Sequence, residues 1–156
     1  VITDASGRGM GIYFPWRHLG LVSALPAQLS PSDSFAAEAL TVCSAIHRLP
    51  RWRAAGRHIR RLAILSDSAN SVAMYTTLSA SPDMNRMLIS AVDVLIDCDC
   101  TYRIDHIPGE YNPVADALSR GLLEKAYTID PLLNIVTFTP PRDALGDREL
   151  CIHSST

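Results

Sequence analysis

The sequence predicts an α/β fold in which helices flank a mixed five-stranded sheet. Three observations lead to this prediction. The first 25 residues are rich in β-branched and aromatic residues and hold turn-forming glycines, which is typical of antiparallel strands. The apolar residues then recur at three- and four-residue spacing, which is typical of amphipathic helices. Two short apolar segments, 60–67 and 101–107, lie among these helices, as strands do in a sheet covered by helices.

The N-terminal segment is expected to form three antiparallel strands. VITDAS, at 1–6, begins with β-branched residues, and the glycines of the following SGRGMG suit a tight turn. GIYFPWRHLGLVSAL, at 11–25, holds enough apolar residues for two more strands, where Pro15 limits pairing to an edge, an end or a bulge. Because Val1 already lies in an apparent strand, we expect the chain to be excised from a longer polypeptide.

A long amphipathic helix is expected next. Ser32, Asp33 or Ser34 can cap its start. At 100° per residue, Glu38 falls on the rim of the apolar face, so its side chain is predicted to point along the sheet surface without being buried in the core. The apolar face comprises Phe35, Ala39, Val42, Cys43, Ile46 and Leu49.

RRLAILSD, at 60–67, is predicted as a central strand because it is apolar on both faces. It ends in Asp67, which we expect at the carboxyl end of the sheet, where open α/β folds bind their ligands. Ser68 can cap the helix that follows. SPDMNRMLISAVDVLI is then predicted as a further amphipathic helix. Its apolar side comprises Met84, Met87, Leu88, Ala91, Val92, Leu95 and Ile96.

Asp116 is expected in the first turn of a short helix. TYRIDHI, at 101–107, alternates as a strand does, and HIPGEYNPVADALSRG follows. Asn112 can cap the new helix, Pro113 suits its first position, and Gly121 lies where a left-handed residue would end it. Taken alone, Asp116 would only complement the helix dipole. A ligand role requires other carboxylates nearby.

Four acids thus come from four different elements: Asp4, Glu38, Asp67 and Asp116. Carboxylates at short range raise one another's pKa unless a cation lies between them. Mg²⁺ takes oxygen ligands and recruits phosphate, and two such ions about 3.5–4 Å apart can stabilise both the attacking and the leaving oxygens of a phosphodiester.

Four segments of the chain closely resemble the ribonuclease H domain of retroelement reverse transcriptases, of the gypsy-type long-terminal-repeat elements and of the tyrosine-recombinase type. These segments are TDAS, FAAEAL, LSDSAN and HIPGEYNPVADALSR. The resemblance spans about 1–121 and implies a ribonuclease H-like fold. It also implies an endonuclease that hydrolyses the RNA strand of RNA/DNA hybrids.

The resemblance implies that Asp4, Glu38, Asp67 and Asp116 are the catalytic and metal-binding residues, holding two Mg²⁺ ions with Mn²⁺ as a substitute. In that family Asp4 would lie between both ions, Glu38 and Asp67 would bind one, and Asp116 the other. A metal-activated water attacks the phosphorus and leaves 5′-phosphate and 3′-hydroxyl ends.

The chain departs from the family in two places. Cellular members carry a mobile histidine in the loop before the last helix, but here that loop is only GEYN, and His106 is predicted on the preceding strand. Glu110 could replace the histidine. The interval from Asp67 to Asp116 leaves no room for the basic helix with which some cellular members hold the hybrid. A fused or associated reverse transcriptase polymerase domain is therefore an expected partner.

Contacts to the substrate are predicted beside the acids, at Ser6, Gly7, Ser68 and Asn70, although turns and caps explain these residues equally well. Recognition of the hybrid is expected through shape, phosphates and 2′-hydroxyls. Six of the thirteen arginines lie between 48 and 61, at the expected far end of the Asp67 strand. They form either a solvated face or a contact surface for a partner or a phosphate backbone.

The domain organisation is predicted as a ribonuclease H-like domain at 1–121 and a C-terminal arm or interdomain linker at 122–156, where the periodic signal fades. No apolar run is long enough to span a membrane. The four cysteines lack paired metal-ligand spacing, so we expect reduced thiols in an intracellular protein. They are Cys43, Cys98, Cys100 and Cys151.

Two alternative functions remain. A catalytically weak ribonuclease H-like domain could act as a tether or protein-binding module, in keeping with the net charge of −2 and the missing basic helix. A related integrase or Holliday-junction nuclease would require a different spacing of the acids. Because all four acids are present, the sequence favours the active enzyme.

Overall fold

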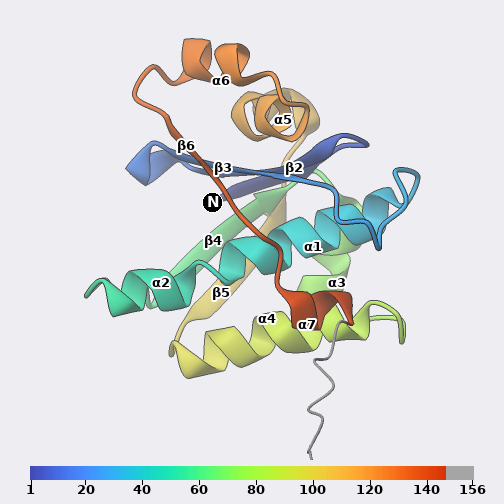
Figure 1. Ribbon diagram of the computed structural model, residues 1–156. Coiled ribbons are helices and arrows are strands. Elements are labelled where there is room, and N and C mark those ends of the chain that lie inside the picture. Colours follow the sequence, from blue (N-terminus) through green and yellow to red (C-terminus); the bar gives the residue numbers. More distant parts are fainter. Residues whose placement is uncertain (147–156) are drawn as a thin grey trace, which may run out of the picture.

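Six strands form one mixed sheet in the order β5-β4-β1-β2-β3-β6 (Figure 1). The first three strands are antiparallel neighbours, while β4 pairs parallel with β1 and β5 pairs parallel with β4. The structure is a computed structural model and describes residues 1–146. The strands are β1 (Ile2–Ala5), β2 (Gly9–Phe14), β3 (Leu19–Ala24), β4 (Arg61–Ser66), β5 (Thr101–His106) and β6 (Asn134–Thr137).

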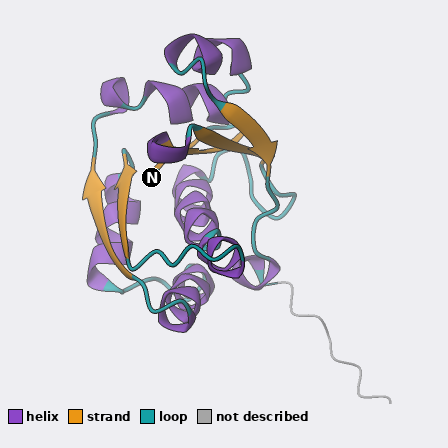
Figure 2. Cartoon of the chain, turned by 90° about the vertical axis from the view of Figure 1, so that its left-hand side faces the viewer, coloured by secondary structure: helices purple, strands orange, loops and turns teal. Residues whose placement is uncertain are grey.

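Helices cover both faces of the sheet (Figure 2). α5 packs on β1, β2 and β3, and α6 packs on α5. On the opposite face α1 and α3 pack on the sheet, and α4 packs on α1. The helices are α1 (Ser34–Ile46), α2 (Leu49–Ala54), α3 (Ala69–Thr77), α4 (Asn85–Asp97), α5 (Pro113–Ser119), α6 (Leu123–Ile129) and α7 (Arg142–Leu145), with single 3₁₀ turns at η1 (Pro15–Arg17) and η2 (Gly109–Tyr111).

The sixth strand corrects the predicted count of five. β6 pairs parallel with β3, from Leu19 opposite Asn134 to Val22 opposite Thr137. A short apolar run is enough for this strand because β3 would otherwise be an unpaired edge. The described part of the predicted arm therefore adds α6, β6 and α7 to the domain. The rest of the predicted segment 122–156 lies outside the described residues.

Several local predictions are confirmed. Asp33 caps α1 by accepting a hydrogen bond from the Ala36 amide at 3.2 Å, and Ser68 caps α3 by accepting one from the Ser71 amide at 3.3 Å. Pro15 lies outside the strands, in η1. Three of the predicted free thiols are free and buried, and the fourth, Cys151, lies outside the described residues. The three are Cys43, Cys98 and Cys100.

Ile96 is an exception in the apolar pattern of α4, because 70% of it is exposed. Consecutive helical residues differ by about 100° in direction. Ile96 therefore points about 140° away from Ala91, which is buried in the apolar stripe. None of the helices in the described part of the chain combines the length and the apolar character that a membrane span requires.

Gly11 allows α5 to lie directly against β2. A Cβ atom at this position would lie 2.5 Å from the Ala115 carbonyl oxygen and 2.7 Å from the Ser119 amide nitrogen. These are backbone atoms of α5, so relief of the clash requires the whole helix to move. The close approach of β2 and α5 therefore depends on the absence of a side chain here.

Gly11→Ala is expected to lower the free energy of unfolding by about 3 kcal/mol, the upper range for overpacking a core. Urea unfolding followed by circular dichroism measures this loss. Gly7→Ala is the matched control, because a Cβ there would meet only the Pro31 carbonyl oxygen at 3.7 Å. Equal stability of the two variants would contradict the tight contact between β2 and α5.

Candidate functional site

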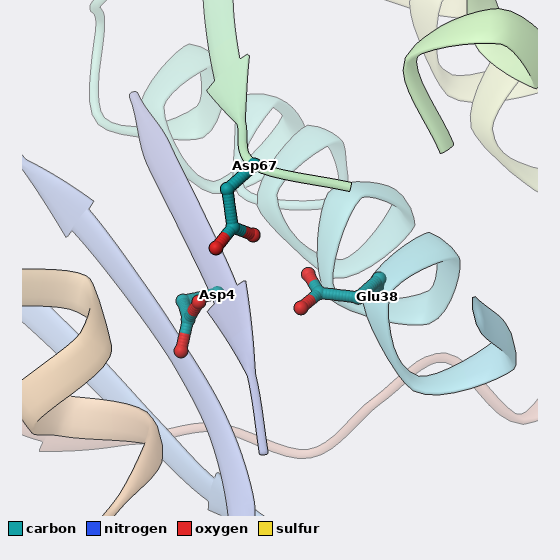
Figure 3. A group of neighbouring side chains, drawn as sticks. All are labelled: Asp4, Glu38 and Asp67. Atoms are coloured by element: carbon teal, nitrogen blue, oxygen red, sulfur yellow. The ribbon is translucent and has the colours of Figure 1, made fainter. Parts of the chain in front are cut away.

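Three of the four predicted acids come together at the carboxyl ends of β1 and β4. Asp4 lies in β1, Asp67 directly follows β4, and Glu38 lies in the first half of α1. Each offers one carboxylate oxygen, and these three oxygens all lie within 4.8 Å of one another. Figure 3 shows the three side chains converging on one space. We call this group the acid cluster.

The sheet register explains why Asp4 and Asp67 meet. β1 and β4 are parallel, with Thr3 opposite Ser66, so the next residue on each strand is an acid at the same edge of the sheet. Ser66 is the last residue of β4, and Asp67 turns the chain into the capped start of α3. The pairing of two strands thus fixes two of the three carboxylates.

Glu38 is more deeply placed than the sequence predicts. Only 8% of it is exposed, because α1 packs across β1 and β2. The Ala5 amide donates a hydrogen bond to Glu38 Oε1 at 3.1 Å, which holds the carboxylate beside Asp4. Glu38 Oε2 is buried and has no hydrogen-bond partner among the described residues. One oxygen is therefore fixed by the backbone, and the other is available to a ligand.

Two members of the acid cluster, Asp4 and Glu38, have raised pKa values when no cation is bound. Burial raises the pKa of Asp4 to about 7, with smaller increases from the charges of Asp67 and Asp116 and an opposing hydrogen bond from Ser119. Burial likewise raises the pKa of Glu38 to about 8, with the charge of Asp4 as the next cause. A bound cation would remove this conflict between close carboxylates.

Asp116 does not join the three acids within that 4.8 Å group. It lies in the first turn of α5, as predicted, and its Oδ1 accepts a hydrogen bond from Arg120 Nε at 2.9 Å, one turn further along the helix. Its charge still raises the pKa of Asp4, so the carboxylate lies near the acid cluster. Asp116 therefore lies on α5, close to Asp4 but outside the group of three oxygens.

The start of α5 differs from the prediction. Pro113 is its first residue and Gly121 follows its end with φ of 74°, as expected, but Asn112 makes no side-chain cap. Instead Asn112 Nδ2 donates to the Thr3 carbonyl oxygen at 3.3 Å, and the residue is buried. The side chain is used for a tertiary contact that ties α5 to β1. This contact positions Asp116 relative to Asp4.

The predicted substrate-contacting residues have separate structural roles. Ser6 Oγ donates to the Ser119 carbonyl oxygen at 2.8 Å and accepts from the Arg8 amide at 3.1 Å. Ser68 is the cap of α3, whereas Gly7 and Asn70 are exposed. Their contacts with a substrate remain a prediction.

Ser119 is a site residue that the sequence reasoning missed. Its hydroxyl donates a hydrogen bond to Asp4 Oδ2. The same hydroxyl oxygen lies 2.9 Å from the Asp116 carbonyl oxygen. Its position three residues after Asp116 places both on one face of α5, a signal that was present in the sequence. A cavity of about 330 Å³ adjoins Ser119 and is lined by Arg8 and Arg120 among others.

The loop after β5 borders Asp67. His106 is the last residue of β5, as predicted, and its Nε2 lies 3.1 Å from the Asp67 carbonyl oxygen. A Cβ atom at Gly109 would lie 3.2 Å from Asp67 Oδ2, so η2 comes close to this carboxylate. Glu110, in η2, is exposed. That Glu110 takes the place of the mobile loop histidine of cellular ribonucleases H stays a prediction.

Comparison with known proteins identifies the fold. No family model and no curated protein matches the chain. Among solved structures, the chain is similar to ribonuclease H1 from the halophilic archaeon Halobacterium salinarum NRC-1, with a TM-score of 0.55 and 17% sequence identity. The alignment covers 80% of this chain and 96% of that chain. The chain has the ribonuclease H fold.

The ribonuclease H fold confirms the predicted α/β class and the helices on both faces of the sheet. A likeness at 17% identity concerns the fold alone. What the site does must therefore be argued from its own side chains, which offer only oxygen ligands within the acid cluster. Hard divalent cations such as Mg²⁺ bind oxygen ligands of this kind.

Proposed function

We propose that this chain is a divalent metal-dependent endonuclease that hydrolyses the RNA strand of RNA/DNA hybrids. The observation that carries the proposal is the acid cluster: Asp4, Glu38 and Asp67 within 4.8 Å of one another at one edge of a ribonuclease H fold. The similar archaeal protein is named as a ribonuclease H1. The sequence motifs TDAS, LSDSAN and HIPGEYNPVADALSR point the same way.

The acid cluster fits Mg²⁺, with Mn²⁺ as a substitute. The pKa values of Asp4 and Glu38 are raised, the donor atoms of the cluster are all oxygens, and Glu38 Oε2 is a buried oxygen with no hydrogen-bond partner in the described chain. We propose that Asp4, Glu38 and Asp67 hold the metal and that Asp116 completes a site for two ions. When bound, such ions stabilise the charge that develops on phosphodiester oxygens during hydrolysis.

The protein's own groups hold these ligands in place. The Ser119 hydroxyl and the Ala5 amide donate hydrogen bonds to Asp4 and Glu38 respectively, so neither carboxylate is free to rotate. Preorganised ligands lower the cost of arranging the site at the moment of reaction. We propose that the four flanking residues contact the hybrid from the rim of the cluster. These are Ser6, Gly7, Ser68 and Asn70.

We further propose that the chain is the ribonuclease H domain of a retroelement reverse transcriptase and works inside the cell beside a polymerase domain. The phrase ADALSR and the short GEYN loop support this context. An alternative is a tether or protein-binding module of low activity. The specific observation in its favour is the number of exposed apolar residues in and beside α6, which are Leu122, Leu123, Tyr127, Ile129 and Leu132.

Cleavage of labelled duplexes tests the proposed activity. In Mg²⁺ or Mn²⁺ we expect the RNA strand of an RNA/DNA hybrid to be cut, with 5′-phosphate and 3′-hydroxyl ends on the products. Duplex DNA and duplex RNA of the same sequence should stay intact. A folded protein that leaves the hybrid uncut in both metals would contradict the enzyme and favour the tether.

A further inference from the structure

A second polar pocket lies towards the other end of α1. Arg48 lies two residues beyond the end of α1 and ten residues after Glu38, which corresponds to about 15 Å along a helix. The pocket has a volume of about 330 Å³ and lies between the end of α1, the start of α2 and the residues that follow β6. Its polar lining comprises Ser44, His47, Arg48, Arg51, Thr137 and Thr139.

Arg48 and Arg51 line this pocket, and Arg17 lies outside the lining but close enough for its charge to act on Arg48. Within residues 1–146, no carboxylate forms an ion pair with Arg17, Arg48 or Arg51. Arg48 Nε and Arg17 Nη1 are buried and donate no hydrogen bond in this part of the chain. Leaving a buried donor without a partner is unfavourable, and more so when the group is charged. The pocket therefore contains one buried guanidinium donor, Arg48 Nε, that has no partner among the described residues.

The charges of these arginines also act on one another. The pKa of Arg48 is lowered first by burial and then by the charges of Arg51 and Arg17. Asp143 lies close enough to His47 for its charge to act on the His47 ring. The ring is also hydrogen-bonded to Ser90 Oγ, at 2.7 Å. An anion placed among the three arginines would relieve their mutual repulsion.

Phosphate is the anion that this geometry suits best. Guanidinium groups present planar forks of N–H donors that match phosphate oxygens, and several of them can share one tetrahedral group. The pocket volume accommodates one or two phosphate groups. We propose that Arg48 and Arg51, with Arg17 beside them, form a phosphate-binding site separate from the acid cluster. The phosphate is either free or part of a nucleic-acid backbone.

The two tryptophans of the chain provide a direct reporter for this site. Trp16 and Trp52 lie in edge contact, with ring centroids 5.3 Å apart, and the Arg17 guanidinium carbon lies 5.5 Å from the Trp16 ring centroid. Binding of an anion to the arginines should change their fluorescence. This readout needs neither metal nor cleavage, so it is independent of the proposed function.

The test is a fluorescence titration with pyrophosphate, in chelator and at constant ionic strength. We expect saturable binding that Arg48→Gln weakens by about tenfold, the effect of losing one charge-assisted hydrogen bond. Arg48→Lys should retain part of the affinity. The matched control is Arg57→Gln, an exposed arginine just beyond α2, which should bind as the wild type does. Arg51→Gln is a second, exposed test position if Arg48→Gln fails to fold.

Titration with a short RNA/DNA hybrid in chelator distinguishes the two sources of phosphate. If the site takes a nucleic-acid backbone, Arg51→Gln should weaken the hybrid and pyrophosphate alike, and the two should compete. If the site takes free phosphate, Arg51→Gln should weaken the binding of pyrophosphate and leave the binding of the hybrid unchanged. The proposal is overturned if pyrophosphate causes no saturable change, or if neither arginine variant alters its affinity.

Discussion

Asp4→Asn is expected to lower the rate of hybrid cleavage at least about 100-fold, as loss of a key charge-stabilising group does. Asp4 is the most buried member of the acid cluster, with only 5% of it exposed. Asparagine keeps the shape and can still accept the hydrogen bond from Ser119, but its neutral oxygen binds a divalent cation weakly. Rates with labelled hybrid in Mg²⁺ measure the loss.

The same Asp4→Asn substitution should leave the fold intact and raise the metal-free stability at pH 8. The reason is that burial disfavours the Asp4 carboxylate, whose pKa is about 7. Asp93→Asn is the control, because Asp93 is exposed on α4, away from the cluster. A folded Asp4→Asn variant that keeps more than a tenth of the activity would contradict the assigned role.

Metal-free protein is expected to lose several kcal/mol of stability as the pH rises from about 4 to 8, since each unit of pKa shift corresponds to about 1.4 kcal/mol. The folded state raises the pKa of Asp4 to about 7 and that of Glu38 to about 8. In this pH window the folded state therefore binds more protons than the unfolded state, so stability falls with pH. Urea unfolding at a series of pH values measures the slope.

Two comparisons make this pH dependence specific to the acid cluster. Mg²⁺ should restore stability at pH 8 and have little effect at pH 4, where Asp4 and Glu38 are protonated. Glu38→Gln should reduce the pH dependence without metal, because one of the two titrating carboxyls is gone. Stability that is unchanged between pH 4 and 8, with and without Mg²⁺, would show that these carboxylates do not titrate in this way.

The sequence predicts the positions of the acid cluster well because each acid follows a strong local signal. Asp67 ends a fully apolar strand, and Ser68 then caps a helix. Asp4 lies in a β-branched strand, and parallel pairing of these two strands brings the acids to one edge. Strand periodicity and capping are local properties, so a single sequence reveals them.

Other features depend on tertiary contacts and were not predictable from the sequence. β6 has a weak local pattern and forms because β3 offers an open edge. Glu38 is buried because α1 packs on β1. The Asn112 side chain donates a hydrogen bond to the Thr3 carbonyl oxygen and therefore does not cap α5. Helix periodicity gives the direction of a side chain but does not say how deeply the neighbouring elements cover it.

The most direct test of the account compares hybrid cleavage by the wild type and by Asp67→Asn, in Mg²⁺ and in chelator. Asp67 is the least buried member of the acid cluster, so its substitution perturbs the fold least. The account predicts cleavage of the RNA strand by the wild type in Mg²⁺ only, and none by the variant. Cleavage in chelator, or equal rates for the two proteins, would contradict it.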